Sequence, residues 1–461
     1  MAQIRNMTEG NPAKLFLLFS LPLMAGNVFQ QLYTVVDTMV VGRVLGTSAL
    51  AAVGTVDWFN WMFLAIITGL TQGFSILIAQ KFGEGDLPQM RKAAGNALVL
   101  SGILAVILIL IGEILVAPML RILRVPEEVA PMSAEYLRVI FGGMIVVMAY
   151  NILAALLRAL GDSKTPLYSM IVAASVNVGL DLLFVAVFGW GVRGAAIATV
   201  IAQGCSAVFC LTKILKIEIL AFCRRDFMPE LRLAGRLLFL GMPMALQNIL
   251  ISIGGMIVQM VVNRFGVLFI AAFTATNKLY GLLEIAAISF GYAMTTYTGQ
   301  NLGARKLDRI RKGVRSAVLI AVLTAVLIGV VMLLVGKPLL GLFISGSESN
   351  RLSTIATAYE FLSVMSISLP ILYVLHVVRS SLQGMGRSVM TMISGVAEFC
   401  VRTVVALTLP AVFGYYALFW GEVFAWIGAD VVLIISYVIT IYQLKRTLFG
   451  GSADGGVSEN G

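Results

Sequence analysis

The sequence predicts an all-α integral membrane protein with twelve transmembrane helices in two six-helix lobes. Of its 461 residues, 59% are hydrophobic and only 12% are charged, which is too little polar surface to cover a soluble globule of this size. Apolar runs of the length that a helical span needs, about 20 residues, recur along the chain. The short alternating strands of a membrane barrel do not occur. The lipid bilayer is therefore the expected environment.

Twelve apolar segments follow one another, separated by breaks that carry turn or charge signals. They are residues 15–41, 48–80, 95–118, 134–157, 166–188, 194–215, 237–262, 268–298, 314–336, 355–378, 389–411 and 415–441. If the N-terminus lies inside, Lys and Arg are concentrated in the inner breaks, as the positive-inside rule requires. Because the number of spans is even, both termini are predicted to be cytoplasmic and the chain to cross the cell membrane many times.

The predicted domains follow from these spans. They are a cytoplasmic N-terminal segment (1–14), a first lobe (15–215), a basic cytoplasmic linker (216–236), a second lobe (237–441) and a cytoplasmic tail (442–461). The tail ends in SADGGVSENG, which has no apolar content to pack, so we expect it to be disordered. The apolar start resembles a signal peptide, but it shows no clear cleavage site and continues past Val41, so we expect it to be retained.

The two lobes are internal repeats. The stretch AQKFGEGDLPQMRK at 79–92 matches GQNLGARKLDRIRK at 299–312, with Gln80 opposite Gln300 and Gly83 opposite Gly303. Because six spans separate the two copies, an even number, both halves have the same orientation. We therefore predict parallel repeats related by an axis along the membrane normal. A GxxxG pair at Gly69 and Gly73 also allows close helix contact, although the chain is rich in Gly.

Several classes of protein are not expected. The single histidine rules out HExxH, and no DDxxD, Walker-type GxxxxGK[ST] or GxSxG motif occurs, so we expect neither an enzyme nor ATP-driven transport. No organic cofactor is expected. The net charge of +10 is explained by membrane orientation rather than by nucleic-acid binding. The cysteines have no CxxC spacing and predict no metal or disulfide framework; they are Cys205, Cys210, Cys223 and Cys400.

Asp37 stands out in the first span. An ionised Asp near the bilayer centre costs at least about 2.5–3.5 kcal/mol, so such a residue normally faces protein or water and marks a pathway. The alternative is an acid at a helix end that reaches the headgroups, because Gly42, Arg43 and Gly46 follow closely.

The order and spacing of three stretches resemble the multidrug and toxic compound extrusion (MATE) transporters. They are VDTMVVGRVLGTSALAAVG in the first span and after it, ALGDSKTP after span four and NVGLD in span five. The resemblance implies a secondary antiporter of two lobes around a central cavity, which exports organic, often cationic compounds and drugs in exchange for protons or sodium ions. We expect it to act as a monomer.

The family's amino-lobe cation site carries over to Asp37, to Asn177 and Asp181 in NVGLD, and to Thr199 in GAAIAT. Asn177 and Asp181 are four residues apart and share a helix face. Two carboxylates, an amide and a hydroxyl supply the oxygen ligands that sodium prefers. The same group can hold a proton instead, because neighbouring carboxylates resist double ionisation. The sequence leaves the choice of ion open, and we expect no other metal.

Further polar residues within the spans are substrate-cavity candidates: Gln30, Asn151, Gln247 and Glu284. Pro22 is either a hinge of the first helix or a Pro tolerated in its first turns. The carboxyl lobe departs from the sodium-type branch of the family, because spans seven and ten lack the acids expected there. Glu398 and Arg402 are spaced to pair within one helix. The lone His376, and Glu422 and Asp430, receive no role.

A lipid-linked precursor flippase of the same superfamily is the main alternative function. Such a protein would favour a strongly cationic cavity for anionic headgroups. Asp37, Asp181 and Glu284 favour the export of cations instead. A membrane-embedded enzyme remains a remote alternative. The substrate list and the oligomeric state are not set by the sequence.

Overall fold

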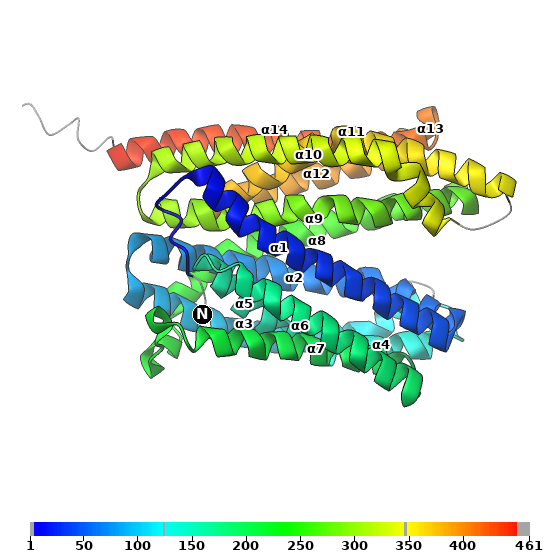
Figure 1. Ribbon diagram of the computed structural model, residues 1–461, viewed down its shortest axis with the longest axis horizontal. Helices are drawn as coiled ribbons and strands as arrows, with labels where there is room; N and C mark the ends of the chain where they lie inside the picture. The colour runs from blue at the N-terminus through cyan, green and yellow to red at the C-terminus, as the bar shows by residue number, and fades with distance from the viewer. Residues whose placement is uncertain (1–3, 123–124, 345–347, 450–461) are drawn as a thin grey trace, which may run out of the picture. The chain divides into compact units, whose positions relative to one another are not determined.

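A computed structural model describes residues 4–122, 125–344 and 348–449, and these residues form helices and no strand (Figure 1). In lipid, a backbone that satisfies its own hydrogen bonds is the stable solution, which explains the uniform helical structure. In the first half of the chain the elements are α1 (Pro12–Val40), η1 (Val41–Leu45), α2 (Thr47–Glu84), α3 (Leu87–Ile122), α4 (Ala130–Gly142), α5 (Met144–Ala159), α6 (Lys164–Asp181), η2 (Leu182–Val187) and α7 (Gly191–Ile214).

The remaining elements begin with two short 3₁₀ turns in the predicted linker. They are η3 (Glu218–Leu220), η4 (Arg224–Phe227), α8 (Leu231–Val262), η5 (Asn263–Phe265), α9 (Val267–Gly303), α10 (Leu307–Phe343), α11 (Glu348–Gly384), α12 (Ser388–Thr408), α13 (Pro410–Phe413) and α14 (Tyr416–Phe449). Most of the predicted tail, residues 450–461, lies outside the described part of the chain.

The twelve predicted spans each correspond to helical structure. Within the described residues, ten helices are long and apolar enough to cross a membrane, and α4 with α5, bent by 46°, makes an eleventh. The predicted span 268–298 lies in α9, which is 37 residues long but is not among those eleven. Its sequence is interrupted by Thr274, Asn277 and Lys278, and many of its other polar residues, such as Thr276 and Ser289, are buried against protein.

The chain divides into two compact units. Among the described residues, unit 1 contains 4–5, 18–78 and 86–256, and unit 2 contains 6–17, 79–85, 257–344 and 348–449. The lobe limits predicted from the sequence stay predictions. We describe each unit by itself.

In unit 1, α5, α6 and α7 run side by side (Figure 1). Phe59 and Phe63 on α2 pack on Phe141 of α4, with ring centroids 4.7–5.5 Å apart. The predicted GxxxG contact is confirmed, because a Cβ atom added to Gly69 would lie 2.7 Å from the backbone of Ala245 on α8. Small residues therefore bring the α2 and α8 backbones together, as in other membrane helix pairs.

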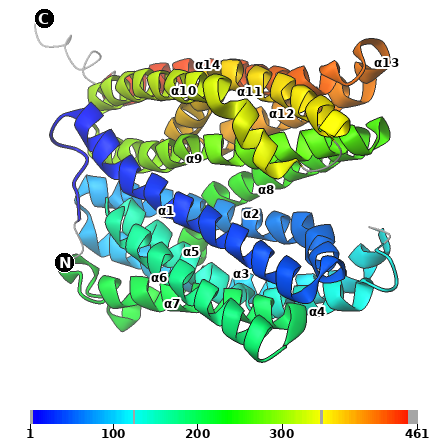
Figure 2. The same ribbon diagram turned by 45° about the vertical axis from the view of Figure 1, so that its right-hand side comes forward.

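In unit 2, α10, α11 and α14 run along one another (Figure 2). The packing between α9, α11 and α14 is carried by a stack of aromatic rings. Phe361 lies between Phe273 and Phe419, with centroid distances of 4.9 and 4.8 Å. Stacked rings of this kind contribute beyond their buried area.

The repeated stretches at 79–85 and 299–303 meet in unit 2. A Cβ atom on Gly83 would collide with the carbonyl oxygen of Gln300, and one on Gly303 would collide with that of Gln80. These are the residues that the internal repeat pairs with each other. The contact is therefore reciprocal, which is the pattern that a two-fold relation produces.

We expect Gly83→Val to destabilise the protein, because a side chain there must displace the backbone at Gln300. Overpacking of this kind costs about 1–3 kcal/mol or more. Thermal unfolding of the purified protein in detergent measures the loss. Gly102→Ala is the control, since a Cβ atom at Gly102 meets nothing within 4 Å. A Gly83→Val protein as stable as this control would contradict the close contact.

Candidate cation site

Two acids of unit 1 lie beside irregular helical turns. Asp37 is on α1, which ends at Val40 and continues as the π-helical turn η1. Asp181 is the last residue of α6, and the π-helical turn η2 follows directly. The two turns are in contact with each other. Single π turns widen a helix locally and occur frequently at functional sites.

The structure brings the four predicted cation ligands together. The carboxyl groups of Asp37 and Asp181 lie within side-chain hydrogen-bonding range of each other. Asn177, one turn before Asp181 on α6, is fully buried like Asp181. Its Nδ2 atom donates to the Thr199 Oγ1 atom on α7, at 3.5 Å. Helices α1, α6 and α7 therefore contribute to one cluster, which we call the cation site.

The cation site holds buried oxygen atoms that have no hydrogen-bond donor. They are Oδ1 of Asp37, Oδ1 of Asn177 and both carboxylate oxygens of Asp181. Buried acceptors without a partner are costly, and buried carboxylates more so. A sodium ion or a proton would satisfy them, because both are bound by such oxygens. Among the described residues, no group of three or more His, Cys, Asp and Glu side chains could hold a metal ion, so the amide and hydroxyl oxygens are needed for a metal.

Sequence reasoning missed three polar neighbours of these acids. Tyr33 precedes Asp37 by four residues on α1 and lies within side-chain range of Gln203 on α7. Tyr136 on α4 is 6% exposed and lies within electrostatic range of both Asp37 and Asp181. The helical spacing of four could have pointed to Tyr33. Nothing in the sequence places Tyr136 there, because only tertiary packing brings α4 to the site.

A fourth neighbour is Asp57 on α2, which lies within electrostatic range of Asp37. It is exposed, unlike Asp181. It lies in the second predicted span, 48–80, and its proximity to Asp37 was not predicted. Asp37 thus faces carboxylates from two other helices, which increases the need for bound positive charge.

An apolar hollow of about 320 Å³ lies between α1 and α6. It is lined by Phe29, Leu32, Tyr33, Val36, Ala174, Ser175 and Val178. Tyr33 and Val36 precede Asp37 on the same helix, and Val178 lies between Asn177 and Asp181. None of the four cation ligands lines the hollow, although it lies on the same two helices as Asp37, Asn177 and Asp181.

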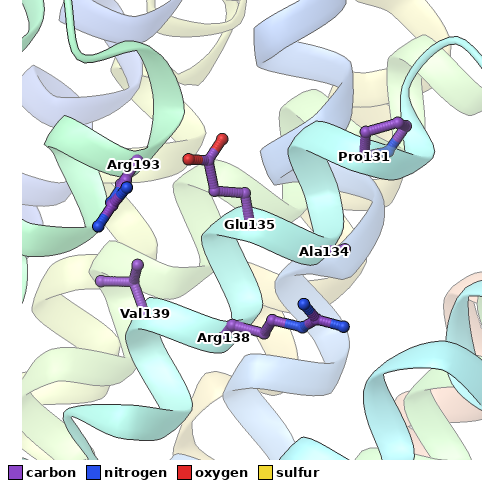
Figure 3. A pocket seen from close by; sticks show the side chains of 6 residues that line it. All are labelled: Pro131, Ala134, Glu135, Arg138, Val139 and Arg193. Carbon is purple, nitrogen blue, oxygen red and sulfur yellow. The ribbon is translucent and has the colours of Figure 1, made fainter.

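A second hollow of about 520 Å³ opens beside α4 and α7 (Figure 3). Three charged side chains line it, those of Glu135, Arg138 and Arg193, and all three are exposed. None of the predicted site residues lines it. It is a charged surface depression, separate from the predicted chemistry.

The other predicted residues have different surroundings. Asn151 donates to the Val147 carbonyl oxygen of its own helix at 2.8 Å, and Gln30 is partly buried on α1. Gln247 on α8 is buried, and its Oε1 atom has no donor. Pro22 lies inside α1.

The predicted pairing of Glu398 with Arg402 in unit 2 is confirmed. Arg402 Nη2 lies 2.9 Å from Glu398 Oε1, one turn apart on α12. The sequence did not predict their further partners, Arg379 and Glu422. Glu284 pairs with His376, with 3.5 Å between Oε1 and Nε2. These contacts join helices that are distant in sequence, so spacing alone could not reveal them.

Comparisons with known proteins agree on one family. The MatE family model matches residues 22–183 and 243–408. A relative in Bacillus subtilis, the probable multidrug resistance protein YpnP, is 33% identical over 364 residues, which are 78% of this chain and 82% of the relative. The FAD transporter of Shewanella oneidensis is 25% identical over 370 residues, 78% of each chain.

Solved structures share the fold. A crystal structure of a MATE protein in complex with MaL6 matches 97% of this chain and 100% of its own, with a TM-score of 0.89 and 23% sequence identity. The family model covers well over half of the chain, and it includes the stretches that contain Asp37, Asn177 and Asp181. The chain is thus a multi-pass membrane protein that belongs to the MatE family, the multidrug and toxic compound extrusion transporters.

Proposed function

We propose that this protein is a secondary active multidrug efflux antiporter, which exports organic, often cationic compounds in exchange for protons or sodium ions. The cation site carries the proposal. Four buried acceptor oxygens on Asp37, Asn177 and Asp181 lack donors, so the site gains stability when it binds a proton or sodium ion. A relative named as a probable multidrug resistance protein supports the proposal that the other transported ligand is a drug.

The mechanism that we propose is alternating access of two lobes. A proton or sodium ion that enters the cation site from outside satisfies the oxygens of Asp37 and Asp181 and reduces their net negative charge. A cationic drug beside them then loses electrostatic attraction and leaves. Exchange follows only if the ion and the drug favour different conformations, because coupling is a difference in affinity between states.

The hollow between α1 and α6 supports the choice of substrate class. Its lining is mostly apolar, and Phe29, Tyr33 and Val36 are on the same helix as Asp37. Ligand sites commonly combine an apolar wall with a few placed polar groups. A flat aromatic cation would place its rings against this wall and its charge toward Asp37. A cavity for lipid-linked anions would require basic residues instead.

The orientation of the chain in the membrane and its oligomeric state are part of the same proposal. The excess of Lys and Arg in alternate breaks supports cytoplasmic termini in a cell membrane. We propose that the protein is a monomer and needs no cofactor besides its coupling ion. Labelling of single cysteines introduced at Glu9 and in the α3–α4 break tests the orientation, because only sites outside the cell react with an impermeant reagent.

Efflux from proteoliposomes tests the proposed function. The protein is reconstituted with ethidium inside, and a pH gradient or a sodium gradient is imposed separately. We expect one gradient to drive ethidium out, and that gradient identifies the ion. Liposomes without protein give the leak. If neither gradient moves ethidium, the assignment of cationic substrates is wrong, and FAD, an anion, is the next cargo to test.

We expect Pro22→Ala to lower the rate of gradient-driven ethidium efflux without changing ethidium affinity. Pro22 has no backbone donor and weakens α1 ahead of Asp37, so its loss stiffens the helix against bending. Efflux rates and equilibrium binding of ethidium to the same preparation separate the two effects. Unchanged efflux would show that Pro22 is merely tolerated in the first turns of the span.

A further inference from the structure

Charged side chains gather inside unit 2, on four different helices. They form what we call the unit 2 charge network: Glu284 on α9, His376 and Arg379 on α11, Glu398 and Arg402 on α12, and Glu422 and Asp430 on α14. Intramembrane charges of this kind are costly and usually serve a function. The network lies apart in sequence from the cation site of unit 1.

The central contacts of the network are short. Glu398 accepts from Arg379 Nη2 at 2.6 Å and from Arg402 Nη2 at 2.9 Å. Arg402 also reaches Glu422 Oε2, at 2.8 Å. Glu398 is 3% exposed and has two guanidinium partners, so its own charge is well compensated.

The network as a whole is not compensated. It contains four carboxylates and two guanidinium groups, so with a neutral imidazole it carries two excess negative charges. Arg379 and Arg402 form their ion pairs with Glu398 and Glu422. Among the described residues, neither Arg pairs with Glu284 or Asp430. An excess of this size inside a bilayer requires bound positive charge.

Asp430 gives an independent sign of a missing partner. It is 7% exposed and lies within electrostatic range of Arg379 and Glu398. Its Oδ1 atom has no hydrogen-bond donor, and Arg379 Nε has no acceptor. A buried carboxylate oxygen without a donor is satisfied when it carries a proton that it can share.

Protons fit this network better than a metal ion does. Two guanidinium groups lie among the carboxylates and would repel a bound sodium ion. Among the described residues no metal-binding group of His, Cys, Asp and Glu occurs. His376 is the only histidine of the chain, and its side chain and that of Glu284 are 19% and 30% exposed, so this end of the network is accessible. Histidine binds and releases protons near neutral pH.

A buried polar face of α12 leads toward the network. Ser388, Thr391 and Ser394 precede Glu398 at helical spacing and are almost fully buried. Thr391 and Ser394 donate to backbone carbonyls one turn back, at 2.9 and 2.7 Å. Their oxygen lone pairs stay available to accept a hydrogen bond. This face therefore offers a route from the N-terminal end of α12.

Among the described residues, the charged groups within electrostatic range of Asp430 are Arg379 and Glu398, both already in the network. Besides the network residues, Tyr280 on α9 and Tyr373 on α11 lie within electrostatic range of Glu284. Helix α10 packs on α11, but its charged residues lie between Asp308 and Arg315 and at Lys337. Tyrosines supply hydroxyl donors and no positive charge.

We propose that the unit 2 charge network is a second proton-binding site, which takes up one proton on His376 beside Glu284 and one on Asp430. The two protons bring the network from two excess negative charges to neutrality, and no covalent bond other than to these protons forms or breaks. The role of this site in transport rests on the proposed antiport function. Proton binding at the site does not depend on any drug.

Nuclear magnetic resonance of the single histidine tests the proposal without transport. The full chain, expressed without a histidine tag and labelled with ¹⁵N-histidine, gives one imidazole, which is followed between about pH 5 and 8. We expect it to change protonation in this range. Glu284→Gln should displace the midpoint, because it removes the carboxylate that lies 3.5 Å from the imidazole. Asp430→Asn should displace it through Glu398, which lies within electrostatic range of both His376 and Asp430. Glu113→Gln, an exposed acid on α3, should not displace it.

Each outcome decides the matter. An imidazole that keeps one state across the range, or a midpoint that neither variant displaces, overturns the proposal. If replacing choline by sodium at constant ionic strength changes the signal as pH does, the ligand is a metal ion and the proton assignment is wrong. Size-exclusion profiles show whether each variant folds. If Asp430→Asn fails to fold, Glu284→Gln still tests the proposal, because Glu284 is more exposed than Asp430. Absence of ethidium efflux would contradict the proposed function and leave this result standing.

Discussion

Asp37→Asn is expected to abolish the coupling between the ion gradient and ethidium efflux. The change keeps the size of the side chain but removes the charge that faces Asp181, so one fewer proton or sodium ion is attracted to the cation site. Coupling free energies of about 1–3 kcal/mol correspond to factors of about 5 to 150, and we expect a loss in this range. Proteoliposome efflux with and without the effective gradient measures it.

Asp308→Asn is the matched control for this prediction, because Asp308 is an exposed acid in the first turn of α10. It should retain wild-type coupling. Asp181→Asn should resemble Asp37→Asn, and the double variant should lose little more, because either change breaks the same pair. Gradient-driven efflux at the wild-type rate in Asp37→Asn would remove this acid from the mechanism.

Glu398→Gln is expected to cause the largest loss of stability. It leaves Arg379 and Arg402 buried without the carboxylate that they share. Breaking a buried ion pair from one side costs about 3–5 kcal/mol, because an uncompensated charge stays behind. Unfolding of the purified protein in detergent, followed by circular dichroism, measures the difference from wild type.

An exposed ion pair provides the contrast. Glu230 lies 2.5 Å from Lys92, and both side chains are well exposed, so Glu230→Gln should cost less than about 1 kcal/mol. Adding Arg379→Gln to Glu398→Gln should cost less than the sum of the two single changes, because the partners share one interaction. Equal losses for Glu398→Gln and Glu230→Gln would show that the buried contacts do not stabilise the fold.

The cation site and the unit 2 charge network show which contacts the sequence could predict and which it could not. Asn177 and Asp181 were predictable as one face of a helix, and their link to Asp37 and Thr199 came from the family resemblance. Tyr136 was not predictable, because α4 reaches Asp37 only through packing. Likewise, the pair of Glu398 and Arg402 follows from spacing of four, whereas Arg379 and Glu422 come from other helices.

The sequence by itself determined the membrane class, the helical segments and the repeat. Apolar length and helical spacing are local properties, and a span must satisfy its own backbone wherever it lies. The breaks also predicted the segment 268–298, which is helical in the structure as α9 although it does not pass a simple hydropathy test for a span. The repeat also named the residues of the reciprocal contact at Gly83 and Gly303.

Only the tertiary structure decided which buried charges meet. Side chains from four helices form the unit 2 charge network, and their distances depend on the rotation of each helix about its axis. A helix with polar residues on one face, such as α12, gives no sign in its sequence of the partner that the face will contact. Charge balance in low dielectric is a property of the whole cluster, so the excess near Asp430 becomes visible only when all its neighbours are in place.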